Sequence, residues 1–354
     1  MKALILTSTT SPKVKAGVEA YSEQLAKVFP GSEIIGTERA GKNAFEGFPP
    51  LREPLRALSV CRHAEKACNM IKPDIVIAHG MYSWALRPEK VGRPVINISH
   101  GTFAGLADNA IPKVSPEYYR TRFIYSHFEK TGAKNADAVV SNSKLTQELN
   151  RKYYGVESKV IRNFVDTEIF RPIGKEKARK KLGIDDEGRL GLFVGRQEYQ
   201  KGFDLLEEIA VKMQGTKFIS ITSPITSDAK AGNIAAVPPV GREELALYYN
   251  AADFVVFPSR FEGFGFVICE ALACNTPVVS SEVGIALEIE IEGLEKVGSR
   301  NAEDWKNAIG RLPEKCDSGK FMRENFSTER FSAEFIALAE TLQKKSIKTS
   351  QWQD

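Results

Sequence analysis

Short apolar runs and longer amphipathic segments alternate along the whole chain. Buried strands are predicted at residues 3–6, 33–36, 75–78, 95–99, 138–141, 159–161, 190–194, 217–222, 254–257 and 277–280. Helices are predicted between them, for example at 18–28, 55–70, 116–131, 203–213 and 243–250. This alternation is typical of parallel sheets with helices on both faces. The predicted fold class is therefore α/β, with two Rossmann-like domains.

The predicted domain boundaries follow from where this alternation is interrupted. Pro172 and Gly174 break the pattern after the sixth strand. We predict an N-terminal domain at 1–168 and a second domain at 169–325. Residues 326–354 are predicted to form a helix that packs back on the first domain, followed by a polar tail. A chain of 354 residues is long enough to give each domain its own core.

Composition indicates a cytoplasmic protein. No apolar run approaches the length needed to cross a bilayer, and the start of the chain lacks the features of a signal peptide. The five cysteines are scattered and do not have metal-ligand spacing. A reducing compartment and the absence of a metal site are the resulting expectations.

Charge is unevenly distributed between the two halves. Residues 1–165 carry 24 Lys and Arg against 15 Asp and Glu, whereas residues 166–325 carry 21 against 26. The basic half could face an anionic partner, or it could be ordinary solvated surface, which is the favoured interpretation. No recognition motif for nucleic acid accompanies the charge.

The segment 116–128 mixes Arg with aromatic residues on a predicted helix. It could be an interfacial helix that recognises lipid headgroups at the inner membrane face. A core-facing aromatic stripe with outward-reaching Arg side chains is the favoured alternative. Peripheral contact with an anionic membrane is therefore a hypothesis.

Several glycine-bearing loops come directly after predicted strands. In open parallel sheets, ligands bind outside the carboxyl ends of the strands. The residues that follow strands in this way are Gly17, His79-Gly80, His100-Gly101, Gly195-Arg196 and Glu262. The sequence therefore predicts chemistry at these strand ends. His79 and His127 are interpreted as structural histidines.

The most informative segment runs from Phe257 to Ala271 and contains two carboxylates. Glu262 lies in a glycine-bearing turn, and Glu270 lies eight positions later on a predicted helix. Gly263 and Gly265 permit close approach of a ligand where that helix begins, and free N–H groups there favour an anion. Carboxylates accept hydrogen bonds from sugar hydroxyls. The combination points to a nucleotide sugar.

A second loop, at 193–202, supplies positive charge. A buried strand delivers Gly195 and Arg196, and Lys201 comes just before the next helix. Arg offers a fork of donors and Lys a compact charge, which suits a diphosphate. Taken alone, the two cations are equally compatible with surface charge.

Taken together, these motifs resemble the retaining glycosyltransferases of family 4. Further segments that carry the resemblance are 160–170, 16–19, 100–102, 141–143 and 270–279. The resemblance covers nearly the whole chain and implies the GT-B fold, in which two facing Rossmann-like domains border a cleft. It further implies transfer of a hexose from a UDP- or GDP-sugar to an acceptor hydroxyl, with retention at the anomeric carbon.

The resemblance also implies roles for individual residues. Arg196 and Lys201 would hold the donor diphosphate, Glu262 the transferred sugar and Glu270 the ribose. His100 would lie near the donor sugar, and Gly17 would let the first loop approach phosphate or acceptor. The remaining binding positions implied are Gly195, backbone groups around Phe264, Gly265 and Phe266, and Pro239 and Val240 beside the nucleobase.

Two further features of the sequence concern the first loop and the expected use of a metal. Ala16 precedes Gly17 where the family usually has paired glycines, which could narrow the first loop. No Asp-x-Asp motif is present, so we expect no metal and no other cofactor. Arg196, Lys201 and a helix N-terminus would stabilise the leaving diphosphate instead.

Two rival functions use the same residue patterns. A GT-B nucleotide-sugar epimerase would bind the same donor but change the sugar without an acceptor. A non-catalytic partner would keep the fold to bind a nucleotide within a glycosylation complex. Retention of Arg196, Lys201 and Glu262 favours the transferase. The nucleobase, the sugar and the acceptor are left open by the sequence.

Overall fold

The computed structural model describes residues 1–9, 17–40, 49–184, 188–223 and 231–350. Two compact units are present. The first, here called unit 1, consists of Met1–Asn163 and the chain from Glu329 onward. The second, unit 2, is the contiguous stretch Phe164–Thr328. The boundary between them falls at residues 163 and 328, where the sequence suggested 168 and 325.

Unit 1 is built on a six-stranded sheet whose strand pairs are all parallel. The order across the sheet is β2-β1-β3-β4-β5-β6. Every residue of β3 and β4 is buried, as expected for parallel strands covered on both faces. The strands are β1 Ala3–Leu6, β2 Glu33–Ile35, β3 Ile75–His79, β4 Val95–Ser99, β5 Ala138–Ser141 and β6 Lys159–Val160.

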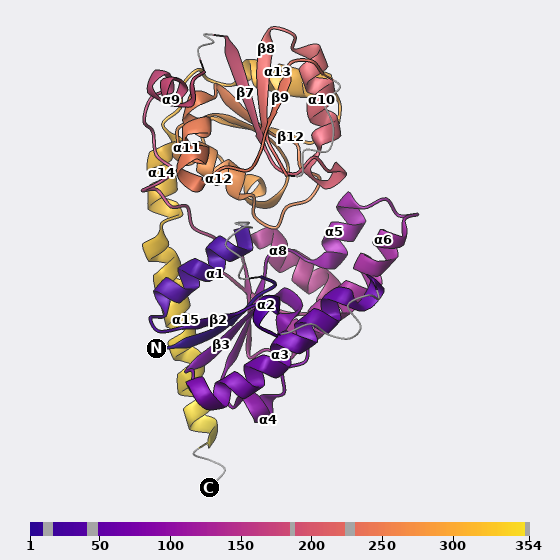
Figure 1. Ribbon diagram of the computed structural model, residues 1–354, viewed down its shortest axis with the longest axis vertical. Helices are drawn as coiled ribbons and strands as arrows, with labels where there is room; N and C mark the ends of the chain where they lie inside the picture. The colour runs from indigo at the N-terminus through magenta and orange to yellow at the C-terminus, as the bar shows by residue number, and fades with distance from the viewer. Residues whose placement is uncertain (10–16, 41–48, 185–187, 224–230, 351–354) are drawn as a thin grey trace. The chain divides into compact units, whose positions relative to one another are not determined.

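Helices flank this sheet (Figure 1). The core on one face joins β1 and β3 to the long helix α3. The α-helices of unit 1 are α1 Gly17–Val28, α2 Thr37–Ala40, α3 Arg52–Ile71, α4 Pro88–Val91, α5 Phe103–Ala110, α6 Pro116–Tyr119, α7 Ser126–Lys134, α8 Lys144–Leu149 and α15 Thr328–Ser350. Shorter helical turns are η1 Pro49–Leu51, η2 Gly80–Ser83, η3 Arg120–Tyr125 and η4 Asn150–Tyr154.

The helix predicted at 116–131 exists, but its middle turn is wide. The stretch runs through α6, the π-helical turn η3 and α7. Tyr119 and Phe123 are 56% and 55% exposed and stack on each other, so the aromatic residues here do not form a core-facing stripe throughout. Tyr125 and Phe128 do pack against the core. The favoured interpretation is therefore correct only for the second half of this segment.

Unit 2 repeats the architecture with a second parallel six-stranded sheet, ordered β12-β11-β10-β7-β8-β9. The two strands at its edges, β9 and β12, were not predicted from the sequence. The strands are β7 Arg189–Val194, β8 Thr216–Ile221, β9 Ile234–Val237, β10 Phe254–Phe257, β11 Val278–Ser281 and β12 Leu294–Val297.

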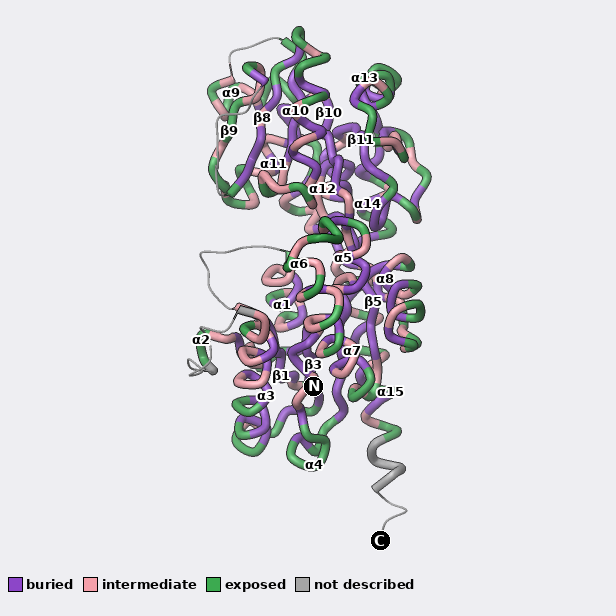
Figure 2. Tube along the Cα trace, turned by 90° about the vertical axis from the view of Figure 1, so that its right-hand side faces the viewer, coloured by how far each residue is buried: buried purple, intermediate pink, exposed green. Residues whose placement is uncertain are grey.

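The helices of unit 2 cover both faces of its sheet. One apolar cluster joins the sheet to α11, α12 and α14, and another joins it to α10 and α13. Figure 2 shows the central strands buried and the outer faces of the helices exposed. The helices are α9 Lys175–Leu182, α10 Phe203–Lys212, α11 Arg242–Ala251, α12 Phe266–Ala273, α13 Ala302–Arg311 and α14 Ser318–Asn325, with turns η5 Tyr199–Lys201 and η6 Gly284–Leu287.

The last helix, α15, belongs to unit 1 although it follows unit 2 in the chain. Its Phe331 and Phe335 are fully buried and contact the ring of Tyr21 on α1 edge-on. Within the described residues, no helix is long and apolar enough to span a bilayer.

Candidate functional site

Two loops of unit 2 cross in direct contact at the carboxyl ends of neighbouring strands. One follows β7 and ends at Gly202, and the other follows β10 and begins at Pro258. Gly202 has a φ of +73°, and a Cβ there would lie 2.0 Å from the carbonyl oxygen of Pro258. Only glycine fits both the backbone angle and the contact. The crossing therefore fixes where Lys201, the residue before Gly202, lies.

Lys201 forms an ion pair with Glu262. The distance from Lys201 Nζ to Glu262 Oε1 is 2.5 Å, and the two side chains are 21% and 14% exposed. Both charges are thus largely removed from water yet reach the surface. A buried partner makes each charge less costly to hold in place. The pair offers a cation for phosphate and a carboxylate for hydroxyls at one point.

Arg260 braces this pair from outside. Its guanidinium makes two hydrogen bonds to Asp204, Nη1 to Oδ1 at 2.7 Å and Nη2 to Oδ2 at 2.6 Å. The same group lies 3.5 Å from the centre of the Tyr199 ring. Arg260 lies two residues before Glu262, and Tyr199 lies two residues before Lys201. The contacts of Arg260 with Tyr199 and Asp204 therefore connect the loop that carries Glu262 to the segment that carries Lys201.

Arg196 does not join this pair. Its Nη1 contacts Glu198 Oε1 at 2.9 Å, and its side chain is 53% exposed. Gly195 permits the loop to start close to the core, since a Cβ there would lie 3.2 Å from the Phe193 ring. The structure therefore brings Lys201 and Glu262 together and leaves Arg196 on the surface beside them in the chain.

The turn after Glu262 leads directly into the N-terminus of α12. Gly265 has a φ of +93° and takes the cap position, and no side chain caps the helix. The first N–H groups of a helix have no partners within it and carry a partial positive charge. Phe264 is buried and packs against Phe266 with ring centres 5.4 Å apart. Backbone donors at 264–266 are thus held rigidly.

Glu270 lies on α12 and is held by α11. The hydroxyl of Tyr249 donates to Glu270 Oε2 at 2.9 Å. Burial raises the pKa of Glu270 to about 6, although the Tyr249 hydrogen bond and the positive charge of Arg242 act in the opposite direction. A carboxylate with one oxygen engaged keeps its other oxygen available as an acceptor.

The positions expected to border a nucleobase lie between β9 and α11. Pro239 is exposed, and Val240 is half-buried against the core of unit 2. This connection follows the carboxyl end of β9, at the same edge of the sheet as the crossing loops.

In unit 1, Gly17 and His100 occupy different environments. Gly17 is exposed and begins α1, whereas Ala16 lies outside the described residues. His100 follows β4, and its Nε2 lies 2.6 Å from Nδ1 of His79. Burial lowers the pKa of His100 to about 4, and burial together with His100 holds the pKa of His79 well below its usual value. Both imidazoles are neutral at pH 7.

Sequence reasoning assigned no role to several residues that hold the site together. Asp204, Tyr199 and Arg260 form the brace, although Arg260 lies within the most informative segment of the sequence. His79 was interpreted as structural, yet it contacts His100 directly. Tyr249 had no sequence signal, because a tyrosine on a helix is ordinary.

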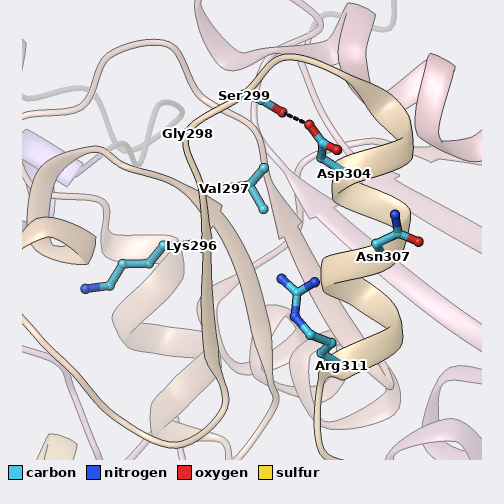
Figure 3. A pocket seen from close by; sticks show the side chains of 7 residues that line it. All are labelled: Lys296, Val297, Gly298, Ser299, Asp304, Asn307 and Arg311. Atoms are coloured by element: carbon cyan, nitrogen blue, oxygen red, sulfur yellow. Dashed lines mark hydrogen bonds between the residues drawn. The ribbon is translucent and has the colours of Figure 1, made fainter.

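Figure 3 shows another hollow, between β12 and α13, of about 290 Å³. Its charged groups are engaged: Lys296 pairs with Glu290, and Arg311 Nη2 lies 3.1 Å from Glu295 Oε2. Ser299 donates to Asp304 across its rim, as the dashed line shows. We assign no function to this hollow. Among the described residues, no group of three or more His, Cys, Asp and Glu side chains is arranged to hold a metal ion.

Two family models match the chain side by side. Residues 17–169 match the model described as Glycosyltransferase Family 4, and residues 188–315 match the model described as Glycosyl transferases group 1. The first match lies almost wholly in unit 1 and the second lies in unit 2.

Curated relatives carry the name D-inositol 3-phosphate glycosyltransferase. That of Mycolicibacterium smegmatis is 27% identical over 352 residues, covering 92% of this chain and 78% of the relative. That of Mycobacteroides abscessus is 29% identical over 253 residues. This second match covers 66% of this chain but only 56% of the relative's length.

Solved structures share the fold across nearly the whole chain. Sucrose-phosphate synthase from Thermosynechococcus elongatus has a TM-score of 0.80 at 19% identity, covering 96% of this chain and 98% of that one. Anabaena HepE in complex with UDP-glucose has a TM-score of 0.72 at 18% identity, covering 97% and 100%. The fold class expected from the sequence, α/β of the GT-B type, is confirmed at the level of two Rossmann-like units.

Proposed function

Because the chain belongs to the group 1 glycosyltransferases of family 4, we propose that it transfers a sugar from a nucleoside diphosphate to an acceptor hydroxyl. The observation that carries the proposal is the Lys201–Glu262 pair beside the N-terminus of α12. Phosphate needs positive charge and N–H donors, and a sugar needs hydroxyl acceptors. These groups meet within one short stretch of unit 2.

The donor is proposed to be a nucleotide-diphosphate sugar, with a UDP-sugar as the first choice. Complexes of the similar HepE with UDP and with UDP-glucose support this choice. In this arrangement Lys201 contacts the diphosphate, Glu262 the sugar hydroxyls and Glu270 the ribose. Arg196, on the same loop as Lys201, turns from Glu198 to the phosphates when the donor binds.

Leaving-group stabilisation is the main catalytic task in this proposal. The bond between the anomeric carbon and the phosphate oxygen breaks, and the nucleoside diphosphate departs with the electron pair. The acceptor oxygen forms its bond on the same face, so that the configuration is retained. Its proton passes to the departing phosphate oxygen. Lys201 and the N–H groups of α12 stabilise the developing negative charge without a metal.

Glu262 is an orienting group rather than a nucleophile in this mechanism. Its Oε1 is already occupied by Lys201 at 2.5 Å. Ion pairing with this cation lowers the nucleophilicity of the carboxylate. The remaining oxygen can bind a sugar hydroxyl, which fixes the sugar relative to the diphosphate.

The test is a donor and acceptor screen with product analysis. UDP- and GDP-sugars are incubated with D-inositol 3-phosphate, the acceptor in the name of the curated relatives, with other polyols, and with EDTA present or absent. A glycosylated product whose anomeric proton coupling matches the donor is expected in both conditions. Inversion, or loss of activity in EDTA, would contradict the mechanism.

The same screen separates the rival functions. An epimerase changes the donor sugar when no acceptor is added. A non-catalytic partner raises its thermal stability on binding nucleotide but forms no product. Donor binding followed by acceptor-dependent product is the pattern that the transferase requires.

A membrane is proposed as a further partner of unit 1. Val114, Tyr119 and Phe123 are 91%, 56% and 55% exposed, and Lys113 is exposed next to Val114. Aromatic and aliphatic side chains beside a cation suit an anionic lipid surface. The triple variant Val114→Ser, Tyr119→Ser, Phe123→Ser should lose flotation with anionic liposomes. Equal flotation of both proteins, or none by the wild type at low salt, would contradict the contact.

A further inference from the structure

Two histidines meet at the ends of adjacent strands in unit 1. His79 ends β3 and His100 follows β4, and these strands are neighbours in the sheet. Their rings are nearly parallel, with an interplanar angle of 16° and centres 4.9 Å apart, and His79 Nδ1 lies 2.6 Å from His100 Nε2. Tyr21 meets both rings edge-on. One of these two nitrogens must carry the proton of the hydrogen bond between them, and the other contacts of the two rings determine which one.

The protonation of His79 is determined by Ser22, which contacts the ring nitrogen that does not face His100. The Ser22 hydroxyl lies 2.9 Å from the carbonyl oxygen of Val18, one turn earlier in α1. A carbonyl has no proton to give, so the single proton of the serine goes to Val18. Ser22 Oγ also lies 3.0 Å from Nε2 of His79. With its proton committed, the oxygen can only accept there, and Nε2 of His79 therefore carries the proton.

The same assignment of donors and acceptors can then be made for the contact between His79 and His100. Each imidazole is neutral, because burial lowers both pKa values and the neighbouring His100 lowers that of His79 further. A neutral imidazole has one N–H group. Since His79 spends its proton on Ser22, its Nδ1 is bare and accepts from Nε2–H of His100. The proton of His100 is then also spent, and its Nδ1 is bare.

We propose that Ser22 and His79 are positioning residues that hold His100 in the Nε2–H tautomer, so that His100 Nδ1 accepts a hydrogen bond from a substrate hydroxyl. His100 is half-buried, and no described residue hydrogen-bonds to its Nδ1. The choice of a hydroxyl as the donor rests on the proposed function, whereas the tautomer does not.

The tautomer decides what His100 does to a substrate. With Nδ1 bare, the ring orients a hydroxyl by accepting its proton in a hydrogen bond. With Nδ1 protonated, the ring would instead donate to the oxygen and leave the hydroxyl proton without this partner. A fixed second partner on the other ring nitrogen is how proteins select between the two forms.

The first test is nitrogen NMR of the wild-type protein labelled with ¹⁵N-histidine. The chain has only four histidines, and His63→Gln and His127→Gln assign the two exposed ones. In a neutral ring the bare nitrogen resonates far downfield of the N–H nitrogen. We expect His79 and His100 both to show a protonated Nε2 and a bare Nδ1 at pH 7.5. An Nδ1–H form of His100, or a charged ring, would overturn the proposal.

The second test compares substitutions that keep or remove the relay. His79→Gln retains an acceptor oxygen for His100 and an amide donor for Ser22, and it should keep the His100 tautomer and most of kcat. His79→Leu removes both partners. Ser22→Ala removes only the acceptor for His79.

We expect kcat to fall roughly tenfold for Ser22→Ala and roughly hundredfold for His79→Leu, as one and two lost hydrogen bonds imply. The donor KM should stay unchanged, and both variants should show mixed tautomers. Equal kcat for His79→Gln and His79→Leu would contradict a positioning role. An inactive wild-type protein with both rings in the Nε2–H form would contradict the proposed function but support the tautomer assignment.

Discussion

The two units differ in the charge of the side chains at the carboxyl ends of their strands. At the strand ends of unit 1, the rings of the buried His79 and the half-buried His100 are uncharged. At the strand ends of unit 2, the Lys201–Glu262 pair is charged and reaches the surface. The same sheet architecture thus carries an uncharged hydrogen-bonded pair in unit 1 and an ion pair in unit 2. The difference lies in the loops, because the strands beneath are buried in both.

Glu129 extends the contrast within unit 1. This buried carboxyl on α7 accepts hydrogen bonds from the backbone N–H of Phe103 at 2.8 Å and from the hydroxyl of Tyr154. Burial raises its pKa to about 7, although both hydrogen bonds act in the opposite direction. The loop that carries His100 ends at this contact, because Phe103 is the first residue of α5. Unit 1 therefore holds its loop with a group that is half protonated near neutrality.

Removing the charge of unit 2 should produce the largest effect. Lys201→Ala is expected to lower kcat about 10³-fold, because it removes the cation that stabilises the leaving diphosphate. The matched control is Lys212→Ala, whose Nζ pairs with Glu303 at 3.2 Å on the surface of α10. Steady-state rates and circular dichroism of both variants provide the check. A Lys201→Ala enzyme within threefold of the control would remove Lys201 from the mechanism.

Neutralising the buried carboxyl of unit 1 should change how stability depends on pH. The pKa of Glu129 is raised from 4.5 to about 7, so the folded state binds the proton more tightly than the unfolded state. The free energy of unfolding should therefore fall by roughly 3 kcal/mol between about pH 4.5 and pH 7 and then level off.

Glu129→Gln should lack this fall, because an amide oxygen accepts the same two hydrogen bonds and does not titrate. Urea unfolding of both proteins at pH 5 and pH 8 measures the difference. Parallel pH dependences of the two proteins would show that Glu129 ionises normally.

The loop crossing of unit 2 should be sensitive to a single methyl group. Gly202→Ala places a Cβ 2.0 Å from the Pro258 carbonyl oxygen, so one of the two loops must shift. Gly183→Ala is the control, since Gly183 has a similar φ of +66° but no atom near its Cβ position. Both substitutions carry the cost of a left-handed backbone. Gly202→Ala should cost about 2 kcal/mol more, and equal losses would mean that the loops are not in contact.

The smallest expected effect concerns the hydrogen bond to Glu270. Tyr249→Phe removes the hydroxyl that contacts Oε2 at 2.9 Å, which costs about 1 kcal/mol of positioning. The affinity for a nucleoside diphosphate should fall about fivefold in isothermal titration. Tyr248→Phe, on the same helix, should bind as the wild type does. Identical affinities for the two variants would separate Glu270 from nucleotide binding.

The sequence was sufficient to predict the central strands and insufficient for the edges of the second sheet. β10 is a continuous apolar run, and β7 is one after its first residue, Arg189, as is typical of buried parallel strands. The edge strand β9 has two exposed alanines, and β12 contains Glu295 and Lys296. Alanine is a poor strand former, and the charged residues of β12 interrupt its apolar run, so neither edge strand has the sequence pattern of a buried parallel strand.

For the candidate site, residue types and strand-end positions were predictable, but partners were not. Glu262 was expected to bind a sugar and Lys201 a phosphate, whereas the structure joins the two directly. Their contact depends on a loop crossing between residues 61 positions apart. The same holds for His79, whose partner is determined by which strand lies next to β3. Contacts between residues far apart in the chain cannot be predicted from the spacing of residues within one motif.

The place of α15 in unit 1 affects how the protein is made. Its Phe331 and Phe335 cover Tyr21, near the opposite end of the chain. During synthesis the ribosome releases all of unit 2 before these phenylalanines emerge, so unit 2 has its whole sequence available first. Unit 1 is completed only by residues that follow unit 2 in the chain. A nascent chain from which residues up to 328 have emerged would carry a complete second unit and a first unit that still lacks α15.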